Sequence, residues 1–172
     1  MSISSHPVLD LSDQYYKVLN AEECHNGFQY IEGLNVLRKP FNDDPKASCV
    51  PGGLYFANAN NISKFDGYGP HVRQVTFPLE DPNFKVVADC ADKFRANMII
   101  LGPRLSVKER LRLGCLTGIR NDEELADEDI LEYLTHQPFY DWMLFDQKRV
   151  QWRHLVSDEF LQKKIAIVYI IC

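Results

Sequence analysis

The sequence predicts an α+β protein with a small mixed or antiparallel sheet in its N-terminal part and a helical C-terminal region. Before Pro103, short apolar runs alternate with Gly, Pro and Asn, which is the pattern of strands joined by turns. After Pro103, apolar residues recur between charged ones at helical spacing. We therefore expect an N-terminal arm at 1–14, an α+β sheet domain at 15–104, and a helical region at 105–172 packed on that sheet.

Several segments of the first part have the composition of strands, because apolar and aromatic residues fill them and turn residues bound them. They are 15–19, 27–30, 53–57, 71–77, 84–88 and 95–101. The stretch 38–51 contains prolines, aspartates and an asparagine, and it is interpreted as a long surface loop. Asn58 is expected to cap a short helix that runs to Phe65, since its side-chain oxygen can accept an unpaired backbone N–H.

The second part predicts helices. Ser106 is expected to cap a helix over 106–116, and Asn121 is expected to cap another over 122–134. A third, buried helix is predicted for 139–156. The segment 157–172 is compatible with a helix or a strand. A helix is the preferred interpretation, whereas its β-branched residues favour a strand.

Composition and charge exclude several classes of protein. The chain is 45% hydrophobic and 25% charged, which is typical of a globular protein and not of a disordered one. The net charge is −5, and the densest basic stretch reads as a solvated helix face, so nucleic acid is not an expected partner. That stretch consists of Lys108, Arg110 and Arg112, and Arg120 follows it.

Cysteine spacing and hydropathy give further expectations. The five cysteines are dispersed without a CxxC pair, which argues against a disulfide framework or zinc site and favours a reducing compartment. The first 14 residues lack the basic and apolar regions of a secretory signal. The longest apolar run, 165–172, falls far short of the ~20 residues that span a bilayer. We therefore expect a chain that is neither secreted nor membrane-spanning.

The segment 25–56 is the most distinctive part of the sequence, because it combines glycines at 27, 33, 52 and 53 with aromatic residues. One interpretation is that the glycines form tight turns and the aromatics fill the core. The other is that a Gly-rich turn opens a ligand pocket, with His25, Tyr55 and Asn58 as its binding residues. The histidines have no metal spacing and the chain contains no common catalytic motif, so catalytic residues stay unknown and neither metal nor cofactor is expected.

The C-terminal region is rich in large apolar side chains. Trp142, Phe145 and Trp152 precede the apolar run 165–171. These residues either pack onto the sheet as core or form a self-association interface, since aromatic residues are favoured at interfaces. Either arrangement requires the run to be covered.

Residues 15–104 carry a set of motifs in a characteristic order. The motifs are YYKVLN (15–20), HNGFQYIEGLNV (25–36), PFN (40–42), PGGLYFAN (51–58), GYGPHVRQVTFP (67–78) and ADKFRANMIILGPR (91–104). This part resembles the N-terminal domain of ankyrin-repeat and uncharacterised proteins of amoeba-infecting giant DNA viruses. The chain length is similar to that of stand-alone members in marseillevirus-type viruses.

This resemblance implies a viral protein that is found in the host cytoplasm or in the virion. The family has no established activity, so it supplies no catalytic residues. The chain departs from the ankyrin-bearing members after Arg104, because it contains neither a T-P-L-H-x-A unit nor a repeat of ~33 residues.

A second, more distant likeness concerns 33–35 and 52–65. These segments look like the glycine- and tyrosine-containing NAD-binding stretch of ADP-ribosyltransferases of the poly-ADP-ribose polymerase type. By that analogy His25 and Tyr55 would bind the nicotinamide and ribose. Asn26 separates His25 from Gly27, and no strand-borne catalytic Glu follows, so the chain departs from that pattern at two points.

The sequence thus leads to two main functional hypotheses, and nucleic-acid binding through the basic residues between 108 and 120 is a third, less favoured one. The preferred one is a non-enzymatic interaction or virion-associated protein with protein partners, which self-associates as a homodimer through its tail. The alternative is an ADP-ribosyltransferase-like domain that binds NAD or another nucleotide at the GGLYF turn (52–56).

Overall fold

The computed structural model describes residues 9–89 and 92–119. The chain divides into two compact units, Met1–Thr117 and Gly118–Cys172, and the strands and helices of the described residues lie in the first. The predicted helices over 122–134 and 139–156 lie outside the described residues. The segment 157–172, for which the sequence allows a helix or a strand, lies outside them too. The interface candidates Trp142, Phe145 and Trp152 lie there too, so these predictions stay predictions.

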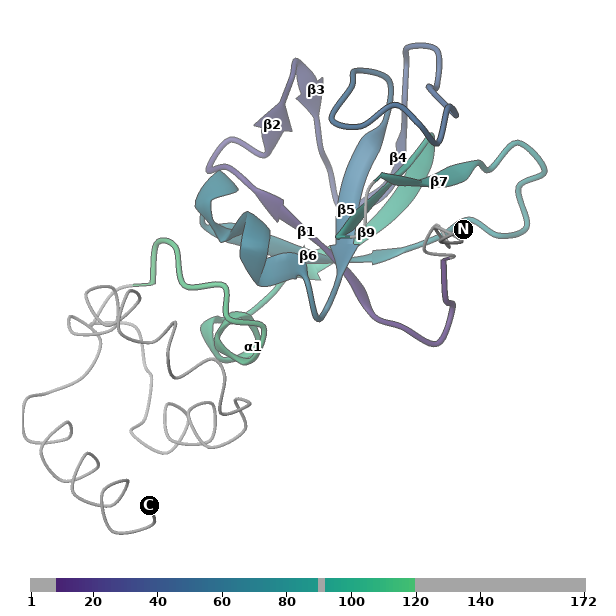
Figure 1. The fold of residues 1–172 in the computed structure, drawn as a ribbon. Coiled ribbons are helices and arrows are strands. Elements are labelled where there is room, and N and C mark those ends of the chain that lie inside the picture. Colours follow the sequence, from purple (N-terminus) through teal and green to yellow (C-terminus); the bar gives the residue numbers. More distant parts are fainter. Residues whose placement is uncertain (1–8, 90–91, 120–172) are drawn as a thin grey trace, which may run out of the picture. The chain divides into compact units, whose positions relative to one another are not determined.

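The first unit is built mainly of antiparallel strands (Figure 1). The larger sheet contains β1 (Tyr15–Leu19), β4 (Gly33–Val36), β5 (Leu54–Asn58), β6 (His71–Thr76), β7 (Val86–Asp89), β8 (Lys93–Ala96) and β9 (Met98–Arg104). Its strand order is β4-β9-β6-β1-β5-β8-β7, and every pairing in it is antiparallel. A separate small hairpin pairs β2 (Cys24–His25) with β3 (Phe28–Gln29).

The strand predicted at 95–101 is wrong, because the chain bends at Asn97 and forms two strands there. The Asn97 N–H donates to the Lys85 carbonyl at 3.1 Å, and its own carbonyl accepts from the Leu37 N–H at 2.8 Å. Its side chain accepts from the Lys85 N–H at 2.7 Å, which fixes the bend. Asn97 is the single residue between β8 and β9 in the sequence. In the sheet order, however, the three strands β6, β1 and β5 lie between β8 and β9. The sheet must therefore curl until both strands meet along one bent segment.

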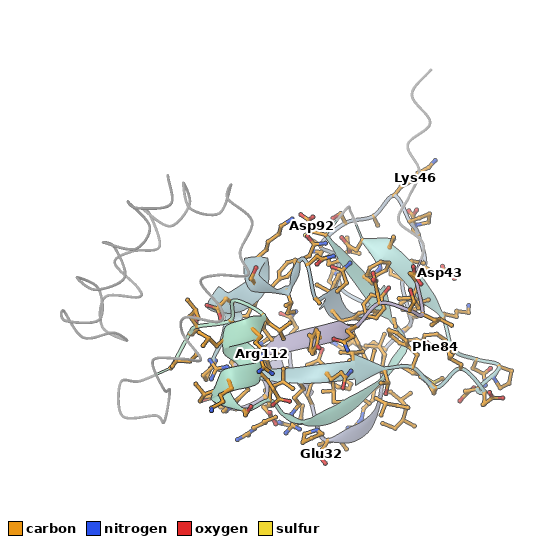
Figure 2. All side chains as sticks on the ribbon, turned by 90° about the horizontal axis from the view of Figure 1, so that it is seen from below. Glu32, Asp43, Lys46, Phe84, Asp92 and Arg112 are labelled. Carbon is orange, nitrogen blue, oxygen red and sulfur yellow. The ribbon has the colours of Figure 1, made fainter. Side chains whose placement is uncertain are left out.

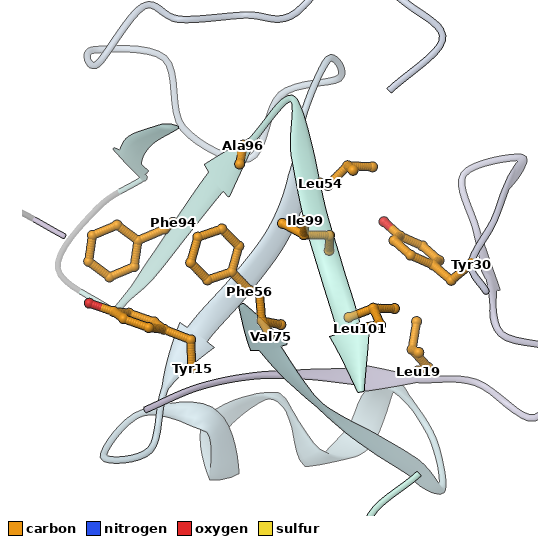
Figure 3. Close-up of a cluster of buried hydrophobic side chains, with 10 residues drawn as sticks. All are labelled: Tyr15, Leu19, Tyr30, Leu54, Phe56, Val75, Phe94, Ala96, Ile99 and Leu101. Atoms are coloured by element: carbon orange, nitrogen blue, oxygen red, sulfur yellow. The ribbon is translucent and has the colours of Figure 1, made fainter. Parts of the chain in front are cut away.

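Curling gives the sheet an inner face that carries the main core. Ten buried residues form this core: Tyr15, Leu19, Tyr30, Leu54, Phe56, Val75, Phe94, Ala96, Ile99 and Leu101 (Figure 3). The ring of Tyr15 packs edge-on against Phe56 and Phe94, with centroids 5.6 Å apart in both pairs. Alternation along β1 explains the arrangement, since Tyr15 and Leu19 point to this face and Tyr16 and Val18 to the other.

The outer face is the side of the sheet that carries Tyr16, Val18, Ala57 and Val72. These residues pack with Ile62 and Cys115, which lie in or just after two short helical segments, one between β5 and β6 and the other after β9. One segment is the 3₁₀ helix η1 (Ile62–Tyr68), and the other is α1 (Val107–Arg112). Residues just beyond Arg104 therefore help to cover the sheet.

Both helical predictions in this unit need correction. Asn58 ends β5 and pairs with Tyr15, so it caps no helix, and η1 begins four residues later after Asn61, whose side chain makes no cap bond. Ser106 does cap α1, through a reciprocal capping box with Glu109. However, α1 ends at Arg112 instead of Leu116, because Gly114 adopts a φ of 71°.

Arg110 also departs from the solvated face predicted for it, because it is buried on α1 and its guanidinium donates to the Thr117 carbonyl. No helix among residues 9–89 and 92–119 is long and apolar enough to cross a membrane.

Candidate functional site

A fully buried ion pair lies on the outer face of the sheet, between Arg95 on β8 and Asp89 on β7. Both side chains are 0% exposed, and Arg95 Nη1 lies 2.6 Å from Asp89 Oδ2. The register explains their meeting, because Arg95 lies opposite Val87 of β7, and Asp89, two residues further along β7, points to the same face as Val87. A buried charge is stable only when a partner and hydrogen bonds satisfy it.

The remaining polar groups of the pair bind the loop 38–51. Arg95 donates from Nε to the Asn42 carbonyl at 2.9 Å, from Nη1 to that of Ala47 at 2.7 Å, and from Nη2 to that of Asp44 at 2.6 Å. Asp89 accepts from Ser48 Oγ at 2.6 Å. We call Arg95, Asp89 and these bonded loop groups the Arg95 clamp. The predicted loop is thus present, but the Arg95 clamp binds it to the sheet. Figure 2 labels two residues of this loop, Asp43 and Lys46.

The paired glycines at 52 and 53 are required by this packing. A Cβ on Gly53 would lie 2.8 Å from the Cβ and Cδ of Arg95. Gly52 has a φ of +96°, and a Cβ there would lie 2.9 Å from the Pro40 carbonyl oxygen. At this turn the structure agrees with the tight-turn interpretation of the glycines, because their missing side chains make room for Arg95 and for the loop.

An exposed thiol lies beside the clamp. Cys49 Sγ is 2.8 Å from Lys93 Nζ, and that ammonium also lies 5.0 Å from the centre of the Tyr55 ring. The Lys93 hydrogen bond, followed by that of Ser48, lowers the pKa of the Cys49 thiol. Because the thiolate is the nucleophilic form of cysteine, this arrangement favours reaction with electrophiles.

Lys93→Met should slow the alkylation of Cys49 by iodoacetamide at pH 7 by about fivefold, since the thiol would lose the ammonium that stabilises its charged form. Peptide mapping by mass spectrometry gives the rate at Cys49 itself. Lys64→Met, which removes an exposed lysine paired with Asp92, is the matched control and should leave the rate unchanged. Equal rates for wild type and Lys93→Met would contradict the assigned role of Lys93.

A second charged cluster lies on the inner face. Glu23 accepts from Arg73 through Nε at 2.8 Å and Nη2 at 3.1 Å, and from Arg104 Nε at 3.0 Å. Burial alone would raise the pKa of Glu23, but the hydrogen bonds from both arginines outweigh it and lower that pKa to about 2. Arg73 Nη1 also donates to the Gly102 carbonyl at 2.7 Å, so the cluster joins the turn before β2 to β6 and β9.

A buried lysine lies near this second cluster. Lys17 is 5% exposed, and its Nζ donates to the Tyr55 carbonyl at 2.7 Å and lies 4.4 Å from the centre of the Tyr30 ring. Burial lowers the pKa of Lys17 to about 7. Burial and the nearby Lys17 charge also lower the pKa of His25.

Of the candidate ligand residues, His25 lies on β2 of the small hairpin, whereas Tyr55 and Asn58 both lie on β5 of the larger sheet. His25 Nε2 accepts from the Asn20 N–H at 3.2 Å, and the Tyr55 hydroxyl donates to the Val50 carbonyl at 2.6 Å. Asn58 donates to Asp13 at 3.2 Å. Within the part of the chain that the structure describes, no hydrogen bond or ring contact joins His25, Tyr55 and Asn58. The nucleotide-site hypothesis stays a prediction, and titration with NAD followed by thermal unfolding is the measurement that tests it.

Sequence reasoning missed the charged residues that the sheet buries. Lys17 interrupts the apolar run YYKVL, and Arg95 interrupts KFRANMII, so a charge inside a strand pattern was the available signal. In residues 9–89 and 92–119, no cluster of His, Cys, Asp and Glu has the arrangement of a metal site.

Comparison with known proteins finds relatives in one giant virus. The chain is 46% identical over 95 residues to the uncharacterized protein R869 of Acanthamoeba polyphaga mimivirus, and the match covers 55% of this chain and 69% of R869. It is 44% identical over 100 residues to that virus's putative ankyrin repeat protein R868, covering 58% of this chain and 50% of R868. A third relative, the putative ankyrin repeat protein R896, is 37% identical over 105 residues, which cover 60% of this chain and 31% of R896.

The match therefore spans only half of R868 and less than a third of R896, although it spans more than two thirds of R869. No family model and no solved structure matches the chain. The motifs noted in the sequence contain the basic residues of these clusters, because Arg73 lies in 67–78 and Arg95 and Arg104 lie in 91–104, whereas their acidic partners Glu23 and Asp89 lie outside the motifs.

Proposed function

Because the chain belongs to the family of the uncharacterized mimivirus protein R869, we propose that it is a giant-virus interaction protein that binds proteins, including a second copy of itself, and performs no catalysis. Residence in the host cytoplasm or the virion, and origin in a marseillevirus-type virus, are part of this proposal. The proposal also includes that the matched segment is an N-terminal domain in the relatives named as ankyrin repeat proteins.

The observation that carries the proposal is an exposed apolar group at one edge of the sheet. Ile31, Leu34 and Val36 are 57%, 50% and 44% exposed, and they lie in or beside β4. Clustered apolar side chains on a protein surface commonly mark binding sites for other proteins. By contrast, the Arg95–Asp89 and Arg73–Glu23 pairs are buried and bind one another and main-chain groups, which is the arrangement of structural contacts.

The names of the relatives support the same proposal. Several are named as ankyrin repeat proteins, whereas R869 is not. Ankyrin repeats stack into arrays that present extended concave binding surfaces. The matched segment is shared by relatives that are named as ankyrin repeat proteins and by one that is not. Such a segment is well suited to be an independent module that is combined with other interaction modules.

Sedimentation velocity of the full chain over a wide concentration range tests the self-association. We expect the weight-average mass to rise from that of the 19.9 kDa monomer towards that of a dimer as the concentration enters the micromolar range. A single 19.9 kDa species at every concentration would remove self-association from the proposal.

A further inference from the structure

We propose that two copies of the chain pair along the free edges of β4, in antiparallel orientation, so that their sheets join into one. This inference rests on the proposed self-association and names the surface that carries it. The candidate surface, which we call the β4 edge, consists of Glu32, Leu34, Val36 and Arg38 together with the outward main-chain groups of Leu34 and Val36.

Among the described residues, the main chain of the β4 edge has hydrogen-bonding groups without a partner. In this part of the chain β4 is the last strand of the sheet, and β9 is the one strand that pairs with it. In an antiparallel ladder, bonded and non-bonded residues alternate, and the bond from the Leu37 N–H to the Asn97 carbonyl continues the β4–β9 register. Gly33, Asn35 and Leu37 therefore face β9, whereas the N–H and C=O groups of Leu34 and Val36 point away from it.

Within β4 itself there is no lysine or proline, and among residues 9–89 and 92–119 no loop covers the exposed side chains of Leu34 and Val36. Sheet edges are commonly blocked by lysine, proline or a covering loop. At the opposite edge of this sheet, the loop residue Ser48 contacts Asp89 of β7, but Leu34 and Val36 of β4 are half exposed. The strand is held in position nonetheless, because buried Asn35 binds the N–H of Ile31 at 3.0 Å and its carbonyl at 2.8 Å.

The sequence of the edge is complementary to itself. An acidic residue, Glu32, precedes the strand, and a basic residue, Arg38, follows it, and both are exposed. One carboxylate oxygen of Glu32 also lies 3.4 Å from Arg73 Nη1, and the side chain keeps 65% of its surface exposed. A twofold axis makes two identical strands antiparallel. When the pairing is centred on Asn35, Leu34 meets Val36 of the partner subunit, and the Glu32 end of one strand meets the Arg38 end of the other.

This register also pairs the correct main-chain groups. Leu34 and Val36 both direct their N–H and C=O outwards, so the two residues can exchange bonds with their counterparts across the axis. A parallel pairing would instead bring like charges together. Because the strand is short, the contact falls at the small end of protein interfaces, and we expect a dissociation constant in the micromolar range.

The test compares dimerisation of Leu34→Lys with that of Leu79→Lys by sedimentation velocity on the full chain. Leu79 is the matched control, because it is 53% exposed and lies in the loop before β7 instead of on β4. We expect Leu34→Lys to weaken the dimer by about tenfold or more, since lysine is a known block to edge pairing. Leu79→Lys should leave the dimer unchanged.

Arg38→Glu should also weaken the dimer, because the substitution would place two acidic strand ends together. Added salt should reduce this effect, since it screens the repulsion between them. Hydrogen exchange on the wild type gives a second readout, with slower exchange of the Leu34 and Val36 amides at high concentration. A wild-type dimer that Leu34→Lys leaves intact would overturn the β4 pairing but preserve self-association. A wild type that stays monomeric would overturn both.

Discussion

Arg95→Met should lower the free energy of unfolding by about 3–5 kcal/mol, because it removes the closest cationic partner of the buried Asp89 carboxylate and leaves Lys93, at 3.8 Å, as the remaining one. The same change leaves the carbonyls of Asn42, Asp44 and Ala47 without the guanidinium donor that binds them. Urea denaturation followed by circular dichroism measures the loss. Lys64→Met is the matched control, since it breaks an ion pair whose side chains are 52% and 42% exposed, and it should cost less than about 1 kcal/mol.

Arg95→Lys keeps the prediction testable should the methionine variant fail to fold. Lysine keeps the positive charge but cannot reach Asp89 and the loop carbonyls together, because it lacks the planar fork of donors. The loop 38–51 should then open more often, and trypsin should cut after the exposed Lys46 faster than in the wild type. Unchanged cleavage, together with unchanged stability, would show that the clamp does not hold the loop.

Lys17→Met should make the protein more stable at pH 7, by about 2 kcal/mol or more, because it removes a buried amine. Burial lowers the pKa of Lys17 to about 7, whereas a lysine in the unfolded chain has a pKa of about 10.4. Between these two values the unfolded state binds more protons than the folded state does. The stability of the wild type should therefore rise as the pH increases from about 7 to about 10.

The slope with pH separates this effect from a simple packing change. Urea midpoints measured between pH 7 and pH 10 should rise for the wild type and lose most of that rise in Lys17→Met. Lys85→Met removes a lysine whose side chain is 60% exposed, and it should keep the wild-type slope. A wild-type slope retained in Lys17→Met would mean that another group titrates, and the assignment to Lys17 would be wrong.

Several strands of the first unit were predictable, because alternation of apolar and polar residues reports directly on a face of a sheet, but no strand was predicted at 33–36 or 24–25, where β4 and β2 lie. The prediction at 15–19 matches β1, and that at 71–77 differs from β6 by one residue. The bend at Asn97 was not predictable, because apolar residues run on through Met98 to Leu101 and the bend depends on contacts with Leu37 and Lys85.

The charged clusters were beyond the reach of sequence patterns for a related reason. The partners Arg73 and Glu23 are 50 residues apart in sequence, and Arg95 binds loop groups up to 53 residues away. Nothing local marks such pairs, since their contact depends on which strands become neighbours. The free edge of β4 likewise follows from its last place in the strand order.

By itself, the sequence determined that the first part forms strands and that Ser106 begins a helix, because these features depend on residues within one or two turns of chain. Relationship to giant-virus proteins also followed from the sequence alone. Only the tertiary structure decided that the sheet curls at Asn97, that Lys17 and Arg95 become buried, and that β4 keeps an open edge. Those outcomes depend on long-range strand pairing, which brings together groups that no short window of sequence contains.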